Sequence, residues 1–245
     1  MTDIVGIGEA LNSKVAEKAY DDAVSKAAKQ FGEFGEDIIK AARLVFFPIQ
    51  IFAAYQDRIE KTLENICSEV PPGRRITPPP LQIIGPIFEN IKYIDSNSIL
   101  YELFKELLTR AIDYERIAEA HPSFIHIIAQ LSHDEAIMLF ELKNNEFEVI
   151  DTMDLDHEKK RFFNRKIEKT TIPVDKLLFP NKAEMYYSHL DSLSLVKWPV
   201  TKEDYLKDDK GVQTGIRRYS KMHLTEFGRF FVNACIPEGG FRNIV

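Results

Sequence analysis

The sequence predicts a mainly α protein, in which an N-terminal helical bundle is followed by a smaller α+β winged-helix-like domain. Two observations support this prediction. Across the first half, apolar residues recur at three- and four-residue steps, the spacing of one buried helix face. In the second half, strand-like segments and turn residues precede a closing helical pattern. We expect a helical domain at residues 1–131, with a proline-rich boundary near 71–80, and a winged-helix-like domain at residues 132–245.

The composition describes an ordinary globular chain. Its 245 residues can bury a substantial core, and the 44% of hydrophobic residues excludes a disordered composition. A net charge of −6 argues against binding nucleic acid over the whole surface. Cys67 and Cys235 form no CxxC pair, so we expect reduced, buried thiols and no cofactor. The N-terminus lacks a basic segment followed by an apolar one, so we expect a cytoplasmic protein.

The N-terminal third of the chain predicts helices. Residues 3–34 are rich in Ala, Lys and Glu with a helical apolar stripe, and residues 38–56 are strongly apolar. The uncharged run at 44–56 is shorter than the ~20 residues needed to cross a bilayer, so we expect no transmembrane span. Pro48 should bend or break this helix. We interpret 38–56 as buried core. The alternatives are a membrane-associated effector that makes peripheral membrane contact through this segment, or a surface for self-association.

The central stretch connects the two halves through local signals. Pro78, Pro79 and Pro80 favour extended backbone, so the preceding helix should end before them. Residues 99–112 show the periodicity of a buried helix. Ser132 and Glu135 form a capping box, which predicts that a new helix begins there.

Short turn and core motifs recur in a particular order along this stretch. They are Pro80-Leu81, Gly85-Pro86, Tyr93, Leu107-Leu108, His121-Pro122 with Phe124 and Ile127, Leu131-Ser132, Glu135-Ala136 and a C-terminal Leu224-Thr225-Glu226-Phe227-Gly228. This order resembles the Abi-alpha (abortive infection alpha) family of bacterial proteins. The resemblance extends over most of the chain and implies phage defence by arrest or death of the infected cell. It supplies no catalytic residues, so we expect a non-enzymatic effector or sensor with a protein partner or self-association.

An acidic segment follows a short strand predicted at residues 147–150. Asp151, Asp154 and Asp156 are the best candidate metal ligands in the chain. They lack the glycine and the final glutamate of a calcium loop, so we expect an acidic surface loop and no metal site.

A basic segment comes next, at residues 159–169, around Phe162 and Phe163. We interpret it as a partly buried helix whose lysines cover its apolar side. The alternative is a nucleic-acid-binding regulator, because basic residues interleaved with aromatics can contact phosphates and bases. The candidate contacts are Lys159, Lys160, Arg161, Arg165, Lys166, Arg217 and Arg218.

The C-terminal third carries the winged-helix pattern. A helix is predicted within residues 182–196, a strand at 196–200, a turn at 208–211 and a closing helix capped by Thr225. Arg217 and Arg218 would then lie on the wing. Because winged helices bind nucleic acid in some proteins and other proteins elsewhere, this fold alone would not identify the function.

The chain contains no GxSxG, P-loop or HExxH motif. Arg116 and His121 resemble the RxxxxH signature of HEPN ribonucleases, in which a cation and an imidazole could bind phosphate and move protons. The polar residue usual after the arginine is replaced by Ile117, and His121 also suits the end of a loop before Pro122. We therefore expect a capping or packing role for His121, and a HEPN-like ribonuclease toxin is the alternative.

Overall fold

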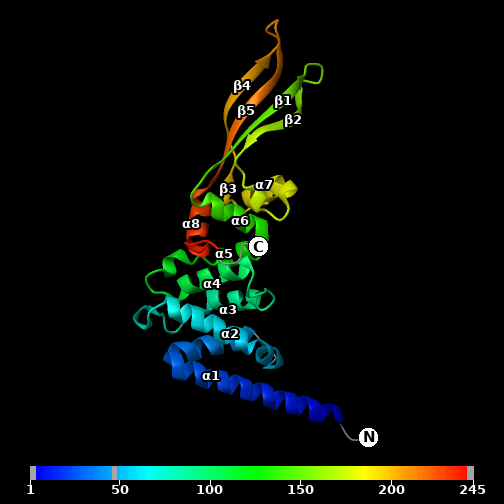
Figure 1. Cartoon of the computed structure of the whole chain (residues 1–245). Coiled ribbons are helices and arrows are strands. Elements are labelled where there is room, and N and C mark those ends of the chain that lie inside the picture. The colour runs from blue at the N-terminus through cyan, green and yellow to red at the C-terminus, as the bar shows by residue number, and fades with distance from the viewer. Residues whose placement is uncertain (1–3, 46–48, 242–245) are drawn as a thin grey trace. The chain divides into compact units, whose positions relative to one another are not determined.

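The computed structural model describes residues 4–45 and 49–241; of residues 4–16, 19, 20, 23, 41–45 and 49–58 it describes the backbone alone. The chain divides into two compact units (Figure 1). The helical unit comprises Met1–Leu131 and Ala234–Val245, and the sheet unit comprises Ser132–Asn233.

The helical unit is built from consecutive helices joined by short connections (Figure 1). The helix α1 is interrupted at Gly32, whose φ of 67° is in the left-handed region that favours glycine. Pro80 directly precedes α3, as expected for a residue that cannot continue a helix from its N-terminal side. The elements are α1 (Ile4–Val45), α2 (Ile49–Glu69), η1 (Pro72–Arg74), α3 (Leu81–Ile91), α4 (Ile99–Ile112), η2 (Ile117–Glu119) and α5 (Ser123–Ile128).

Helix α4 lies at the core of the helical unit. It contacts α2, α3 and α5, and the side chain of Ser98 accepts a hydrogen bond from the backbone N–H of Tyr101 to cap its first turn. The prediction of a buried helix at residues 99–112 is confirmed. Its apolar face is fully buried at Leu103, Phe104, Leu107 and Leu108.

The apolar segment 38–56 is described in part. Ile38 and Ile39 are completely buried, in agreement with a core role at this end. Pro48 and the side chains of residues 41–56 lie outside the described residues. Within the described part of the chain, none of the helices combines the length and apolarity that crossing a membrane requires.

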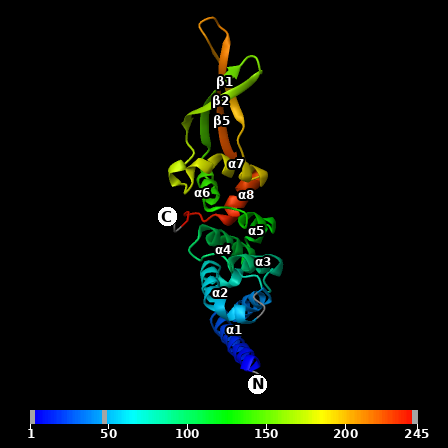
Figure 2. The same ribbon diagram turned by 90° about the vertical axis from the view of Figure 1, so that its right-hand side faces the viewer.

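The sheet unit contains a five-stranded antiparallel sheet together with helices. Strand β5 pairs with β1 on one side and with β3 and β4 on the other, and β2 forms the edge beyond β1. Figure 2 shows β1, β2 and β5 alongside one another. The elements are α6 (His133–Leu142), β1 (Phe147–Asp156), β2 (Arg161–Thr170), η3 (Val174–Lys176), η4 (Pro180–Lys182), α7 (Ala183–Ser192), β3 (Val196–Lys197), β4 (Val200–Lys207), β5 (Gln213–Leu224) and α8 (Glu226–Cys235), of which residues 226–233 belong to this unit.

The predicted fold class, mainly α with a smaller winged-helix-like domain, is wrong. The second half is organised by an extensive antiparallel sheet whose strands reach 10 residues in β1 and β2 and 12 in β5. Arg217 and Arg218 lie within β5, paired with β1 and β4, and not on a wing. The predicted turn at residues 208–211 is real, and it joins β4 to β5.

The two segments between residues 151 and 169 were also misassigned. The acidic segment is not a loop, because β1 continues to Asp156. The basic segment is not a partly buried helix, because it forms strand β2, which is exposed along its whole length. Because both faces of this edge strand are exposed to water, polar and apolar residues do not alternate along it. The two-residue periodicity that usually identifies a strand is therefore absent from the sequence.

The predicted helix caps at Ser132 and Thr225 are confirmed. Ser132 and Glu135 form the predicted capping box at the start of α6. The Thr225 hydroxyl accepts a hydrogen bond from the backbone N–H of Gly228 at 2.8 Å and donates one to the carbonyl of Ser194 at 2.6 Å. A Cβ on Gly228 would lie 1.9 Å from the carbonyl oxygen of Leu195. The Leu224–Gly228 motif therefore brings the start of α8 directly against the turn after α7.

Candidate functional site

A charged cluster in the sheet unit is centred on Asp151, which is 1% exposed. Its Oδ2 atom accepts a hydrogen bond from Nε of Arg165 at 2.8 Å and another from Nη2 of Arg218 at 2.7 Å. Asp151 and Arg218 are directly opposite each other in the β1–β5 pair, and Arg165 belongs to β2. Because two guanidinium groups share one buried carboxylate, the three groups together carry a net positive charge.

Glu184, from α7, contacts the outer side of this cluster. It forms an ion pair with Nη1 of Arg165, yet its own side chain is 66% exposed. Desolvation alone would lower the pKa of Arg165, but the hydrogen bond to Asp151 and the charges of Asp151 and Glu184 raise it overall. Arg165 is therefore a permanent cation with one buried and one exposed partner.

A pocket of about 310 Å³ opens beside the cluster, and we call it the arginine pocket. The guanidinium of Arg165 lies over the ring of Trp198, 5.7 Å from its centroid, and Trp198 meets Tyr187 edge-on at 5.0 Å. The indole N–H of Trp198 donates a 2.8 Å hydrogen bond to the Ser220 hydroxyl, which holds the ring in place. The lining residues are Asp151, Arg165, Glu184, Tyr187, Ser188, Trp198, Val200, Arg218 and Ser220.

A second buried carboxylate, Asp134 of α6, organises the segment between β2 and α7. Its Oδ1 accepts a hydrogen bond from the backbone N–H of Leu178, and its Oδ2 accepts one from the backbone N–H of Phe179, both at 2.9 Å. Oδ2 also accepts a hydrogen bond from the Tyr186 hydroxyl at 2.8 Å. Desolvation alone would raise the pKa of Asp134, but these hydrogen bonds lower it overall. The same surroundings raise the pKa of Tyr186 to about 12, through desolvation and the hydrogen bond to Asp134.

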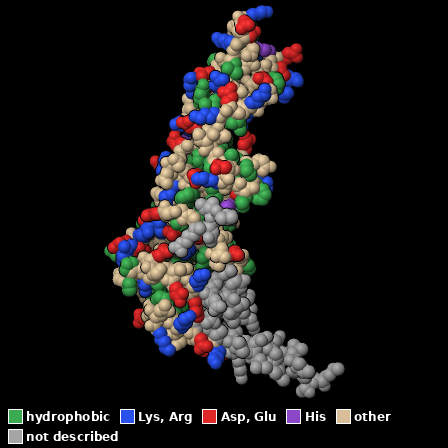
Figure 3. All heavy atoms as spheres, viewed as in Figure 1, with side chains coloured by type: hydrophobic (Ala, Val, Ile, Leu, Met, Phe, Trp, Pro, Cys, Tyr) green, Lys and Arg blue, Asp and Glu red, His purple; other side chains and the backbone are tan. Residues whose placement is uncertain are grey.

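The segment that Asp134 holds presents apolar side chains to solvent. Leu178 is 57% and Phe179 is 54% exposed, while Leu177 between β2 and α7 is buried. The ammonium of Lys182 lies over the Phe179 ring at 4.8 Å. In Figure 3 hydrophobic side chains gather over the α7 region. We call this surface the apolar ledge and define it by Val174, Leu178, Phe179 and Met185.

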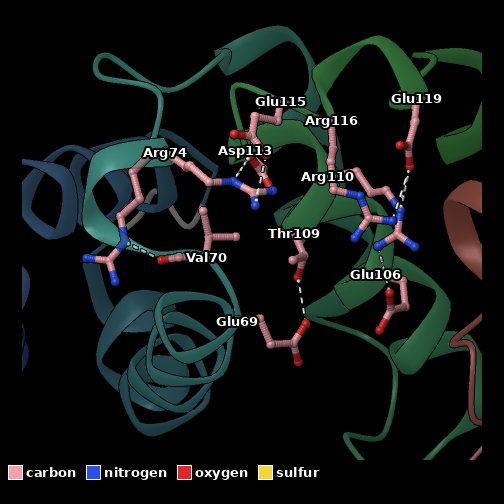
Figure 4. Close-up of polar contacts among 11 residues, drawn as sticks. Glu69, Val70, Arg74, Glu106, Thr109, Arg110, Asp113, Glu115, Arg116 and Glu119 are labelled. Atoms are coloured by element: carbon pink, nitrogen blue, oxygen red, sulfur yellow. Dashed lines mark hydrogen bonds and ion pairs between the residues drawn. The ribbon is translucent and has the colours of Figure 1, made fainter.

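The helical unit contains a separate network of ion pairs (Figure 4). Arg74 pairs with both oxygens of Asp113 and with Glu115, the latter at 2.9 Å. Asp113 is 3% exposed; desolvation alone would raise its pKa, but its bonds to Arg74 and to the backbone lower it overall. Arg75 donates to the backbone carbonyls of Cys67 and Val70, where α2 ends. These contacts fasten the end of α2 to the end of α4.

The candidate ribonuclease residues lie next to this network. Arg116 pairs with Glu119 at 3.3 Å, and Glu119 also pairs with the buried Arg110 at 3.0 Å (Figure 4). Nδ1 of His121 contacts the Ser123 hydroxyl at 2.7 Å and accepts the Ser123 backbone N–H at 3.2 Å. Arg116 therefore belongs to a structural ion-pair network. The ring of His121 is hydrogen-bonded to Ser123 at the beginning of α5. Among the residues that the structure describes, these two side chains are not hydrogen-bonded to each other.

The metal candidates lie along β1 with separate partners. Asp151 is held by the two arginines, Asp154 accepts a 2.6 Å hydrogen bond from the Asn164 amide, and Asp156 accepts the backbone N–H of Lys159 at 3.0 Å. Across the residues that the structure describes, no three His, Cys, Asp or Glu side chains are grouped so as to hold a metal ion.

The nucleic-acid candidates are divided between two faces of the sheet. Arg165 and Arg218 converge in the arginine pocket, whereas Arg217 points to the opposite face, where it makes a bidentate ion pair with Glu168 at 2.9 and 3.0 Å. The other candidates are exposed on β2 or on the turn before it; they are Lys159, Lys160, Arg161 and Lys166.

Sequence reasoning missed several residues of these sites. Nothing near Asp134 in the sequence marks it as the partner of Phe179, 45 residues later. Glu184 and Tyr187 look like surface residues of an amphipathic helix. Trp198 offered one signal, since it is the single tryptophan of the chain.

Comparison with known proteins identifies one related group. The family model described as Abortive infection alpha matches residues 50–235, and this match confirms the resemblance seen in the sequence. Comparisons with curated proteins and with solved structures gave no match.

Proposed function

Because this chain belongs to the Abortive infection alpha family, we propose that it acts in antiphage defence as a non-enzymatic effector or sensor that works through protein contacts. The family's name points to abortive infection. The protein contact is our own inference, and the apolar ledge is the surface to which we assign it.

The observation that carries this proposal is the hydrogen bonding of Asp134 to the backbone of Leu178 and Phe179. Burying a carboxylate is unfavourable unless its oxygens are hydrogen-bonded. Here the donors are the amides of two residues whose large apolar side chains face solvent. The fold therefore uses a buried charge to hold an exposed apolar surface in one conformation.

Further contacts fix the ends of the ledge. Lys176 pairs with Glu141 of α6 at 2.7 Å, and His189 of α7 contacts Glu135 of α6 at 2.6 Å. A surface whose conformation is already ordered loses less conformational entropy when a partner binds. Aromatic and aliphatic anchors of this kind carry much of the affinity in protein interfaces.

A phage-infection assay with matched variants tests the proposal. Bacteria that carry the wild-type gene should yield fewer phage than bacteria without it, for at least one phage of a broad panel. Leu178→Ser with Phe179→Ser should remove this protection, because truncating central anchors weakens binding by about tenfold or more. The control is Tyr205→Ser with Val212→Ser, which removes exposed apolar side chains from the β4–β5 hairpin and should leave protection intact.

Two results would count against the proposal. If the wild-type gene leaves the yield of every phage unchanged, the defence function is wrong. If the ledge variant has wild-type thermal stability and still protects fully, the ledge is not the contact surface.

A further inference from the structure

The arginine pocket has the dimensions of a small-molecule site. Its volume of about 310 Å³ is at the lower end of the roughly 300–1,000 Å³ typical of such sites. All of its lining residues belong to the sheet unit, from β1, β2, α7, β5 and the β3–β4 region. The buried side of the pocket is polar and the Trp198–Tyr187 pair supplies an aromatic wall.

Both guanidinium groups keep donors that their protein partners do not use. Arg165 bonds to Asp151 through Nε and to Glu184 through Nη1, and Arg218 bonds to Asp151 through Nη2. In the described structure, the buried Nε of Arg218 has no hydrogen-bond acceptor. A charged donor without an acceptor is unfavourable. In addition, none of these bonds uses Nη2 of Arg165 or Nη1 of Arg218, so the cluster has unused donors for an oxygen ligand.

The carboxylates around the pocket differ in how firmly they are held. Asp151 is 1% exposed and bonded to both arginines, so it orients them. Glu184 is exposed, and among the described residues its carboxylate pairs with Arg165 alone, so it can swing into solvent. Exposed ion pairs contribute little free energy, and an incoming anion can replace Glu184 on Arg165. The cluster without Glu184 carries one net positive charge.

We propose that the arginine pocket binds a small organic phosphate of about mononucleotide size, with the phosphate on Arg165 and Arg218 and a planar ring against the Tyr187–Trp198 wall. Arginine forks match the geometry of phosphate oxygens, and a planar ring packs favourably against aromatic side chains. This site is separate from the apolar ledge, and the inference does not rest on the proposed function.

Trp198 makes occupation of the pocket directly measurable. Because it is the only tryptophan in the chain, the intrinsic fluorescence excited at the red edge reports on this wall. Titrating the full-length protein with adenosine monophosphate should produce a saturable change in that fluorescence. Adenosine, which lacks the phosphate, should bind much more weakly, and inorganic phosphate should compete with the nucleotide.

Charge variants separate a specific site from general electrostatic attraction. Arg218→Gln should weaken nucleotide binding at least about tenfold, the value of a hydrogen bond to a charged group. Arg217→Gln is the matched control, because it removes the same charge one residue away on the opposite face of β5 and should have little effect. Glu184→Gln should tighten binding roughly two- to fivefold, since it removes a competing exposed carboxylate.

The outcomes decide the proposal in either direction. No response to millimolar nucleotide or phosphate in fluorescence and in calorimetry would overturn it. Equal binding of adenosine and its monophosphate, or equal losses in Arg217→Gln and Arg218→Gln, would overturn it as well. If Arg218→Gln does not fold, the exposed Glu184→Gln variant still tests the site, and binding that is unchanged or weaker there contradicts the assignment.

Discussion

The hydroxyl of Tyr186 donates a 2.8 Å hydrogen bond to the buried carboxylate of Asp134, 52 residues earlier in the chain. This contact connects α7 to α6 and closes a hydrogen-bond network around a single carboxylate. Asp134 therefore determines the conformation of the segment that carries the apolar ledge.

Asp134→Asn should destabilise the protein. The substitution retains one acceptor oxygen but turns an amide N–H₂ toward a backbone or hydroxyl donor. We expect the free energy of unfolding to fall by about 2–3 kcal/mol, measured by urea denaturation. Asp175→Asn, on the same segment but exposed, is the control and should change stability by less than about 0.5 kcal/mol. Equal stabilities of Asp134→Asn and the wild type would refute the role given to Asp134.

The lowered pKa of Asp134 predicts a dependence of stability on pH. A carboxyl whose pKa is lower when folded stabilises the protein above its unfolded pKa of about 3.9, and this contribution is lost as pH falls through the folded value. The stability difference between the wild type and Asp134→Asn should be constant near neutral pH and shrink below about pH 4. Denaturation curves at several pH values measure it; a difference that grows on acidification has the wrong sign.

The two thiols should be unreactive in the folded protein. Cys67 and Cys235 are free and buried. Desolvation raises the pKa of Cys67 to about 11, although the charge of Arg75 opposes this shift. Desolvation also raises the pKa of Cys235 well above its usual value. Since the thiolate is the reactive form, an aromatic disulfide reagent should not label the native protein at pH about 8. Both cysteines should react after denaturation in guanidinium chloride. Rapid labelling of the native protein would show that one thiol is accessible.

His121→Ala should preserve antiphage protection if the protein is not an enzyme. His121 accepts a hydrogen bond from the backbone N–H of Ser123 just before α5, so its loss should cost about 1 kcal/mol of stability, the usual net value of a hydrogen bond. Arg116→Gln should behave similarly, because Glu119 retains its ion pair with Arg110. Phage yield and total RNA from infected cells are the measurements. Loss of protection in stable variants, together with cellular RNA that is cleaved only by the wild type, would establish the ribonuclease alternative.

Gly228→Ala should disrupt the start of α8. The new Cβ would lie 1.9 Å from the carbonyl oxygen of Leu195, a backbone atom that cannot move without breaking the turn after α7. We expect a loss of about 3 kcal/mol or more, seen as a lower midpoint in thermal unfolding. Gly73→Ala, where a Cβ would meet nothing within 4 Å, is the matched control. Similar midpoints for both variants would contradict the close approach.

Features that depend on neighbouring residues were predictable. The capping box of Ser132 and Glu135 spans three positions, and the buried face of α4 repeats every three or four. Strand β2 was mistaken for a helix because both of its faces are exposed, so no alternation of polar and apolar residues marks it. The acidic residues after position 150 were mistaken for a loop because charged residues inside a strand resemble a solvated turn.

The amino-acid sequence by itself determined the family, the buried helix at residues 99–112, the caps at Ser132 and Thr225, and the turn between β4 and β5, but it did not reveal α3, which contains Pro86. Only the tertiary structure decided that Asp151 would meet Arg218, 67 residues away, and that Asp134 would bind the amide of Phe179. The physical reason is the separation along the chain of the residues that interact. Helix periodicity and capping arise from contacts within a few residues, whereas strand register and buried ion pairs depend on which distant segments pack together.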